Sequence, residues 1–415
     1  MKAFWFALLL LLAGALHRIA GVGVNGEAAI VVDDAGTLQI NSSNPLADPV
    51  LLNGQDVVDM LQTHLSMLEA NQQLLANQRS HATSLRQTMC SLHPAHTSAI
   101  PGIGEDGGSW AGGAAAPNGL IYGIPYGASA VLIVNPATRT IDTTSITSLG
   151  SENRKWFDGV LAPNNNIIYA IPSDNANVLA INPATNTANL IALGGSDQTV
   201  NKFRGGVLDP VSGLIYGVPF HANYVLIVDP TTDTVDTTTL AGLSSSTHKW
   251  WGGVAVPDRR IFCIPDNADA VLVIDPATQT LDTTSIKGLG SGGFKWTGGV
   301  LANNGLIYGI PHNRNFVLII DPQAMTTNTT AITGLMQGNK WIGGALAPNG
   351  KVVGIPFVHD AVLVIDPGTN TADITTLAKA GGADSRYVGA VLGPSGFIYG
   401  IPHQAEHVLE IAAGC

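Results

Sequence analysis

Charged residues are scarce in this chain of 415 residues, at 12%, and basic residues are the scarcer kind. The chain has 19 Lys and Arg against 30 Asp and Glu, which gives a net charge of −11. Nucleic-acid binding relies on cations that neutralise phosphates, so nucleic acid is not an expected partner. Hydrophobic residues make up 45% of the chain. This composition excludes a disordered chain and predicts a large folded core.

Recognisable catalytic and cofactor motifs are also missing. The sequence contains no H-E-x-x-H zinc motif, no Gly-rich phosphate loop and no G-x-S-x-G nucleophile elbow. It therefore assigns no catalytic residue, no metal ligand and no cofactor.

Long hydrophobic runs are confined to the first residues. Residues 3–16 form an apolar run that follows Lys2 and precedes small residues. This pattern is typical of a secretory signal peptide, and the run is shorter than the roughly 20 residues that cross a bilayer as a helix. We expect residues 1–21 to be a signal peptide and the protein to be secreted or at the cell surface, without a transmembrane anchor after cleavage; an uncleaved anchor is the alternative. Sequons at Asn41 and Asn328 fit a glycoprotein.

The chain is rich, by contrast, in a repeat of about 46 residues. An aromatic residue opens each unit, and a proline inside strings such as GLIYGIP recurs in step with it. The opening aromatic residues are Trp110, Trp156, Phe203, Trp250, Trp296, Trp341 and Tyr387. The prolines are Pro125, Pro172, Pro219, Pro265, Pro311, Pro356 and Pro402. A period of this length indicates a repeat architecture.

Each unit contains four strand candidates, such as GGVLAP, LIYGIP, VLIVDP and IDTTSI. Four antiparallel strands per 40 to 50 residues are typical of a β-propeller blade. Six units are complete, whereas the seventh, from Tyr387, holds only three strands. Residues 97–104 resemble a fourth strand, so we predict an all-β, seven-bladed propeller over residues 97–415 whose last blade is closed by this N-terminal strand. Such closure removes an exposed sheet edge.

Two of the three cysteines flank the predicted closure. Cys90 and Cys415 align with opposite ends of the turn that the last blade lacks. We predict a disulfide between them, which would persist in a secreted protein. Cys263 occupies a position that is Gly or Ala in the other units, which indicates a buried thiol. The Asp-Pro and Asn-Pro pairs that end the third strands, such as Asp275-Pro276, are expected to cap turns.

The segment before the propeller has a different pattern. Residues 22–50 form a polar arm, and residues 51–80 are predicted to be helical, followed by a linker over residues 81–96. Apolar residues recur at alternating spacings of three and four within residues 56–79, as in a coiled coil. The positions are Val58, Leu61, Leu65, Leu68, Gln72 and Leu75. The two interpretations are a homo-oligomer and a helix packed against the propeller.

The loops after the seven prolines are the most variable part of the repeat. In a propeller these loops lie on one face around the axis, where loop variation on a rigid scaffold places ligand sites. The candidate rim residues are His221, His312, His359, His403, Asp174, Asp266, Asp360, Tyr126, Phe220 and Phe357. The alternative is that these loops are polar and variable only because they face solvent.

A basic residue precedes the opening aromatic in six units. These residues are Lys155, Lys202, Lys249, Lys295, Lys340 and Arg386. If they point to the axis, they form a cationic ring that would attract a small anion, an anionic sugar or an acidic partner. The alternative is that each covers a neighbouring indole or pairs with an acid.

The strings VLIVDPTTDTVDTTTL and VLVIDPATQTLDTTSI, together with LIYGIP, resemble the repeats of YVTN-type and virginiamycin B lyase-like seven-bladed propellers. The resemblance covers residues 97–415 and implies the fold. Those superfamilies contain secreted and surface-layer binding proteins as well as lyases and lactonases. The lactonase-like branch holds a central divalent ion with acidic and amide residues of its inner strands, but among the corresponding strings here only Asp158 and Asp209 are acidic.

Two functions remain open at this point. The first is a non-enzymatic binding or scaffold module for an extracellular ligand, either a glycan or a protein. The alternative is a lyase-like or lactonase-like propeller enzyme that acts on a small anionic or carbohydrate-derived substrate. The lyase-like branch uses histidine near the axis, a role for which the four rim histidines are candidates.

Overall fold

The computed structural model describes residues 29–32, 38–41, 51–52, 55–92, 95–103, 109–194, 199–378 and 386–414. The chain divides into two compact units, Met1–Met89 and Cys90–Cys415. The predicted signal peptide lies outside the described residues. The same holds for Cys415 and for the side chains of Cys90 and Asn41, so the predicted disulfide is not among the described contacts.

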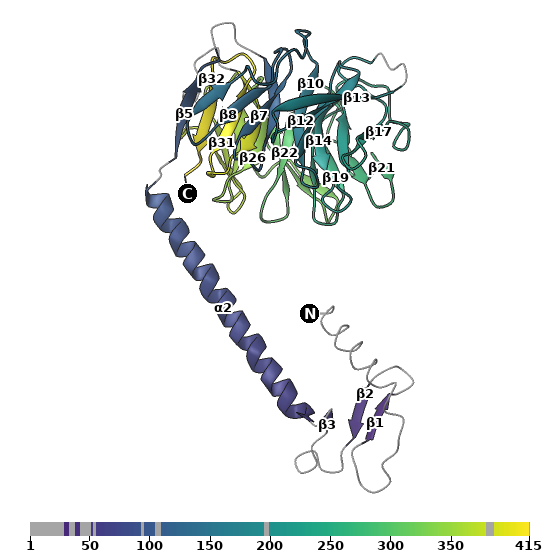
Figure 1. Ribbon diagram of the computed structural model, residues 1–415, viewed down its shortest axis with the longest axis vertical. Coiled ribbons are helices and arrows are strands. Elements are labelled where there is room, and N and C mark those ends of the chain that lie inside the picture. Colours follow the sequence, from purple (N-terminus) through teal and green to yellow (C-terminus); the bar gives the residue numbers. More distant parts are fainter. Residues whose placement is uncertain are drawn as a thin grey trace. The chain divides into compact units, whose positions relative to one another are not determined.

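Seven four-stranded antiparallel sheets make up the second unit (Figure 1). The first strand of each sheet contacts the first strand of the next, and β30 contacts β6, so the sheets close into a ring. The fold is a seven-bladed β-propeller, as the repeat predicts. The first, innermost strands are β6 (Trp110–Ala115), β10 (Trp156–Ala162), β14 (Phe203–Leu208), β18 (Trp250–Ala255), β22 (Trp296–Leu301), β26 (Trp341–Leu346) and β30 (Tyr387–Leu392).

The second and third strands form the core. Their alternating aliphatic residues pack against the neighbouring blade, and each hydrophobic cluster mixes residues of two adjacent blades. The second strands are β7 (Ile121–Pro125), β11 (Ile167–Pro172), β15 (Ile215–Pro219), β19 (Ile261–Pro265), β23 (Ile307–Pro311), β27 (Val352–Pro356) and β31 (Ile398–Pro402). The third strands are β8 (Leu132–Asn135), β12 (Asn177–Asn182), β16 (Leu226–Asp229), β20 (Leu272–Asp275), β24 (Leu318–Asp321), β28 (Leu363–Asp366) and β32 (His407–Ala412). Cys263 is buried in β19, as predicted.

The outermost strands are shorter than the Thr-rich strings suggested. They are β9 (Thr140–Asp142), β13 (Thr187–Ala192), β17 (Thr234–Asp236), β21 (Thr280–Asp282), β25 (Thr326–Asn328), β29 (Thr371–Asp373) and β5 (His96–Pro101). In β9 the Asp142 carboxylate accepts hydrogen bonds from Thr144 N (2.7 Å) and Ser145 N (3.1 Å) and ends the strand. The string IDTTSI is therefore a three-residue strand followed by an Asx turn. In β13, Asn-Leu-Ile replaces Asp-Thr-Thr, and the strand runs for six residues.

The closure of the ring is confirmed. β5 pairs with β32 in the order β30-β31-β32-β5, with Ile100 opposite Val408. Ile100 is completely buried. The Glu410 carboxylate accepts hydrogen bonds from Ser98 Oγ (2.6 Å) and from the Tyr399 hydroxyl (2.9 Å), and it pairs with Arg139 of the first blade.

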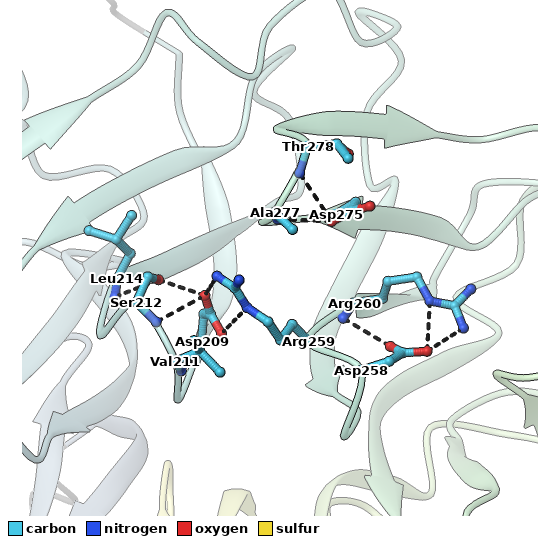
Figure 2. A network of polar contacts seen from close by, with 10 residues as sticks. All are labelled: Asp209, Val211, Ser212, Leu214, Asp258, Arg259, Arg260, Asp275, Ala277 and Thr278. Atoms are coloured by element: carbon cyan, nitrogen blue, oxygen red, sulfur yellow. Dashed lines mark hydrogen bonds and ion pairs between the residues drawn. The ribbon is translucent and has the colours of Figure 1, made fainter. Parts of the chain in front are cut away.

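The turns at the other ends of the strands are held by acids and amides (Figure 2). Asp275 Oδ1 accepts hydrogen bonds from Ala277 N (2.9 Å) and Thr278 N (3.3 Å), which confirms the capping role predicted for the Asp-Pro pairs. Asp209 likewise accepts hydrogen bonds from the Ser212 hydroxyl (2.6 Å) and from Arg259 Nη2 (2.7 Å). Although burial opposes it, these bonds lower the pKa of Asp209 to about 2. Asp209 is therefore a structural residue of a turn.

The first unit contains the helix α2 (Val57–Leu92) and two short antiparallel pairs. The pairs are β1 (Ala29–Val32) with β2 (Leu38–Asn41), and β3 (Leu51–Leu52) with β4 (Gln55–Asp56). The helix begins later than expected and continues through most of the predicted linker, because residues 81–92 contain neither Gly nor Pro. No helix among the described residues is long and apolar enough to cross a membrane.

Candidate functional site at the channel mouth

A ring of backbone hydrogen bonds fixes one face of the propeller. The residue after each strand-ending proline donates its N–H to the residue before the opening aromatic of its own blade, as Phe220 N does to Lys202 O (2.8 Å). Among the described contacts, its carbonyl in five blades also accepts a hydrogen bond from the next blade, as Phe220 O does from Lys249 N (2.9 Å). We call these seven residues the loop ring. They are Tyr126, Ser173, Phe220, Asp266, His312, Phe357 and His403.

A second ring is formed by the residue that follows each opening aromatic. We call it the inner ring, since it belongs to the innermost strands. It consists of Ala111, Phe157, Arg204, Trp251, Thr297, Ile342 and Val388. Several of its apolar members form one cluster with Tyr126 and Phe357 of the loop ring. Side chains of different blades therefore meet across the channel, and the two rings together form its mouth.

Arg204 lies among the aromatic rings of this mouth. Its guanidinium carbon is 4.6 Å from the Phe157 ring centroid, 5.3 Å from that of Trp251 and 5.4 Å from that of Tyr126. Arg204 Nη2 donates to Asn201 Oδ1 (2.6 Å), whereas Nε and Nη1 are buried without a hydrogen-bond partner. Cation–π attraction compensates the guanidinium in part for the water that it has lost.

A third ring lies next along each strand, at the β-bulge where the first and second strands change register. Every member has a positive φ, between 68° and 95°. We call it the bulge ring, and it consists of Gly112, Asp158, Gly205, Gly252, Gly298, Gly343 and Gly389. Neighbouring members are so close that a Cβ on Gly252 would lie 2.9 Å from Gly298 Cα. The six glycines of this ring are suited to it by their conformation and their size, and Asp158 adopts the same positive φ.

A cavity of about 200 Å³ lies between the inner and bulge rings. Its lining includes Phe157, Trp251 and Ile342 of the inner ring, together with Arg204 and Asp158. The seven innermost strands contain no other charged residue than these last two. The channel wall is thus apolar and glycine-rich, with one acid and one base.

Neutral polar groups are concentrated at the mouth. Burial, followed by the nearby charges of His248, Lys249 and Arg204, lowers the pKa of His221 to about 4. Burial and the charge of Lys340 lower the pKa of His312 to about 4. Both histidines are therefore uncharged at neutral pH, and His221 Nε2 and His312 Nδ1 have no hydrogen-bond partner.

Asp266 is the one acid of the loop ring. Its side chain is completely buried, and neither carboxylate oxygen has a hydrogen-bond partner. Burial raises its pKa to about 8, although Lys295 and Arg204 oppose this shift. Asp266 is thus mainly protonated at neutral pH.

Six of the ten predicted rim residues belong to the loop ring, and the other four lie beside it or in separate contacts. His221 stacks on Phe220, with ring centroids 4.9 Å apart. Asp174 accepts a hydrogen bond from Arg154 Nε (2.9 Å), and His359 packs on Trp341 with centroids 5.1 Å apart. Asp360 is exposed.

The residues of the predicted cationic ring do not form an exposed ring of charges around the axis. Its five lysines are buried, and their ammonium groups donate to loop carbonyls, as Lys340 Nζ does to His312 O (2.7 Å). Four of them lie 5.4–6.0 Å from the indole of the following tryptophan. Arg386 is exposed and lies over the Phe357 ring. The lysines therefore fix the loops and cover the indoles, and they do not form an exposed ring.

Arg204, Phe157, Trp251 and Ser173 were not among the residues predicted from the sequence. A signal for them was present in the alignment of the units. The position after the opening aromatic varies from Ala to Arg and Trp, while the next position is Gly in every unit except at Asp158. A variable position inside a regular strand indicates a side chain that faces the channel instead of the core.

Within the described part of the chain, no three His, Cys, Asp or Glu residues lie close enough together to hold a metal ion.

No protein-family model and no curated protein matches the sequence. Many solved structures match the fold. A streptogramin B lyase is 10% identical, with a TM-score of 0.60, over 77% of this chain and 97% of that one. A catalytically inactive histidine-to-alanine variant of virginiamycin B lyase from Staphylococcus aureus, solved with quinupristin, is 9% identical, with a TM-score of 0.62, over 77% of this chain and 99% of that one.

The extracellular domain of a putative hybrid two-component system from B. thetaiotaomicron is also similar. It is 13% identical, with a TM-score of 0.59, over 77% of this chain and 43% of that one. The fold neighbours thus include both enzymes and extracellular domains. In fold, the chain is similar to the virginiamycin B lyases and to these extracellular propellers.

Proposed function

We propose that the protein is a secreted or cell-surface binding propeller that holds a carbohydrate ligand at the channel mouth. The observation that carries this proposal is the convergence of aromatic rings and uncharged polar groups from different blades on one opening. Trp251, Tyr126 and Phe357 are partly exposed there. Aromatic faces stack on the C–H faces of sugar rings, while neutral donors and acceptors bond to hydroxyl groups.

The electrostatics of the mouth suit a ligand that is largely uncharged. The lysines are occupied by loop carbonyls, and the histidines with strongly lowered pKa carry no charge at neutral pH. Polar specificity would come from polar atoms that have no hydrogen-bond partner within the protein, among them His221 Nε2 and the Ser173 hydroxyl. A secreted location agrees with the N-terminal apolar run and with the extracellular neighbours of the fold.

A glycan array with the purified, fluorescently labelled protein tests this function. We expect capture of a restricted set of glycans. Trp251→Ala should weaken capture about 30-fold, the effect expected when a central aromatic contact worth about 2 kcal/mol is lost. Trp251→Phe should restore most of the binding. Leu190→Ala removes an exposed apolar side chain from the outer strand β13 and serves as the control. Capture of no glycan, or equal capture by Trp251→Ala, would reject the proposal.

A lyase function is the second candidate, and a specific observation supports it. Two uncharged histidines at the mouth, His221 and His312, each keep a ring nitrogen without a partner, as a general base requires. Incubation with quinupristin, followed by liquid chromatography, tests it directly. The enzyme would be favoured if the native protein consumes quinupristin and neither His221→Ala nor His312→Ala does. An unchanged quinupristin peak would reject a lyase of this specificity.

A further inference from the structure

We propose that the cavity on the propeller axis is a binding site for a small carboxylate anion, held by backbone amides of the inner strands and by Arg204. This inference does not depend on carbohydrate binding at the mouth, although the cavity and the mouth share inner-ring residues such as Trp251 and Arg204.

The first observation is how the chain itself fills part of this cavity. The Asp158 carboxylate accepts hydrogen bonds from three backbone N–H groups, of Gly159 (2.9 Å), Gly113 and Gly206. These amides belong to three adjacent blades and occupy the same position, immediately after the bulge ring. Each lies after the register shift between the first and second strands, and its N–H points to the Asp158 carboxylate. These amides therefore donate hydrogen bonds to a carboxylate in the folded chain.

The second observation is that four equivalent amides have no such side chain beside them. They belong to Gly253, Gly299, Gly344 and Ala390, and all four residues line the cavity. Their strands carry the same register shift, and the residue before each of them is glycine with a positive φ. The repeat geometry thus presents four further amides to the axis opposite Asp158. Converging amides of this kind bind anions.

The third observation is the unsatisfied cation at the same cavity. Arg204 is 6% exposed and lines the cavity, and its Nε and Nη1 atoms have no hydrogen-bond partner. Its aromatic neighbours hold the guanidinium in place, and the Tyr126 hydroxyl accepts a hydrogen bond from Nη2 (3.4 Å), but none of them accepts one from Nε or Nη1. A carboxylate that reaches Nη1 would give it a charge-assisted hydrogen bond. The volume of about 200 Å³ exceeds that of one water molecule, about 30 Å³, several times.

Asp158 makes the binding dependent on pH. Burial raises its pKa to about 6, although the three amides oppose this shift. Among the seven inner strands, Arg204 on β14 is the only other charged group, and β6 on the opposite side of Asp158 carries none. At the mouth, Asp266 and His403 interact electrostatically with Arg204. An incoming anion is repelled by ionised Asp158 and not by its protonated form, so binding should strengthen as the pH falls below about 6.

Titration calorimetry of the whole protein with sodium acetate, at constant ionic strength, tests the proposal. We expect binding that is about tenfold tighter at pH 5 than at pH 8, since about 1.4 kcal/mol of repulsion disappears. Asp158→Gly completes the glycine ring and frees three amides, so it should bind acetate at pH 8 as tightly as the native chain does at pH 5. Arg204→Gln should weaken binding about tenfold or more. Lys287→Gln removes an exposed positive charge and should leave binding unchanged.

Three outcomes would overturn this site. The first is that no acetate binds to the native chain at pH 5 or to the Asp158→Gly variant at pH 8. The second is equal affinity in Arg204→Gln and in the native chain, with both folded by circular dichroism. The third is stabilisation of the native chain by Ca²⁺ that is lost in Asp158→Gly, which would mark Asp158 as a cation ligand.

Discussion

Single residues at the mouth are buried in ionisation states that differ from those in water. Asp266 is the clearest case, because its side chain is completely buried and neither carboxylate oxygen has a hydrogen-bond partner. An acid whose pKa is higher in the folded chain than in the unfolded chain destabilises the fold progressively as the pH rises between the two values. For Asp266 this window extends from the ordinary aspartate value to about 8.

We therefore predict that, between pH 4.5 and pH 8, the free energy of unfolding of the native protein decreases relative to that of Asp266→Asn. Each pKa unit between the folded and unfolded values corresponds to about 1.4 kcal/mol. Urea unfolding at several pH values, followed by tryptophan fluorescence, measures the difference. Asp360→Asn, at an exposed site of the same face, is the control. Parallel pH profiles for the native chain and Asp266→Asn would contradict the assignment.

The residue scale is also where sequence reasoning reached its limit. The loops after the prolines were identifiable because they vary within a fixed frame, and six loop-ring residues followed from that. Arg204 did not, because a cation beside an aromatic residue inside a strand normally indicates a solvent-facing position. Its cage is made by residues of four blades. Side chains that meet across an axis leave no pattern of spacing along one segment.

Among the elements, α2 presents the clearest unpartnered surface. Leu61, Leu65, Leu68 and Leu75 are between 45% and 58% exposed on this helix of 36 residues. Their alternating spacing of three and four matches the seam of a coiled coil. We predict that the protein self-associates through this seam.

Leu65→Asp should convert the oligomer into a monomer, because a carboxylate cannot be buried in the seam without a partner. Light scattering coupled to size-exclusion chromatography gives the masses. Glu69→Ala changes a charge on the same helix outside this stripe and should leave the mass unchanged. A native chain that is monomeric at every concentration would instead favour the packing of the helix against the propeller.

The strand β5 is the element on which closure of the ring depends. Its removal would expose β32 as an edge and take away the buried side chain of Ile100 together with the hydrogen bond from Ser98 to Glu410. We predict that a chain truncated to residues 109–415 unfolds about 10 °C below a chain truncated to residues 95–415, a loss of about 5 kcal/mol. Calorimetry measures both. Equal midpoints would show that the seventh blade is stable with three strands.

The repeat predicted the elements far better than their ends. The four strands of each unit were predicted from apolar periodicity. The completion of the seventh blade by an N-terminal strand was predicted from the missing copy of one string. The outer strands were predicted to be longer than they are. They end early because Asp142 and its equivalents accept hydrogen bonds from the backbone N–H groups of the next residues. Such local capture is visible in the sequence only as Asp-Thr-Thr, which favours a strand by propensity and ends it by hydrogen bonding.

For the whole molecule, the two ends of the propeller chain are held in the same blade. A Cβ added to Gly414 would lie 2.9 Å from the Cβ of Ala95, and Asn349 Nδ2 donates to Gly414 O (2.6 Å). The disulfide between Cys90 and Cys415 stays a prediction, because Cys415 and the side chain of Cys90 lie outside the described residues.

We predict that mass spectrometry of non-reduced peptides from the secreted protein finds Cys90 linked to Cys415. Reduction, or Cys90→Ser, should lower the unfolding midpoint, since closing so long a loop contributes roughly 5 kcal/mol in the chain-entropy model. Cys263→Ser should leave the link intact. Recovery of Cys90 and Cys415 as free thiols would exclude the bond.

The completion of the last blade by the N-terminal strand β5 has a consequence for how such a chain can change in evolution. The ring is closed by the pairing of β5 with β32, which we call the clasp. Every sequence unit between these strands starts at an opening aromatic residue and ends just before the next one. Duplication or deletion of one whole unit in the middle would therefore alter the number of blades without touching the clasp. Recombination between similar units could thus produce rings with one blade more or one blade fewer. Each ring would have a channel of different width and the same closure by β5 and β32.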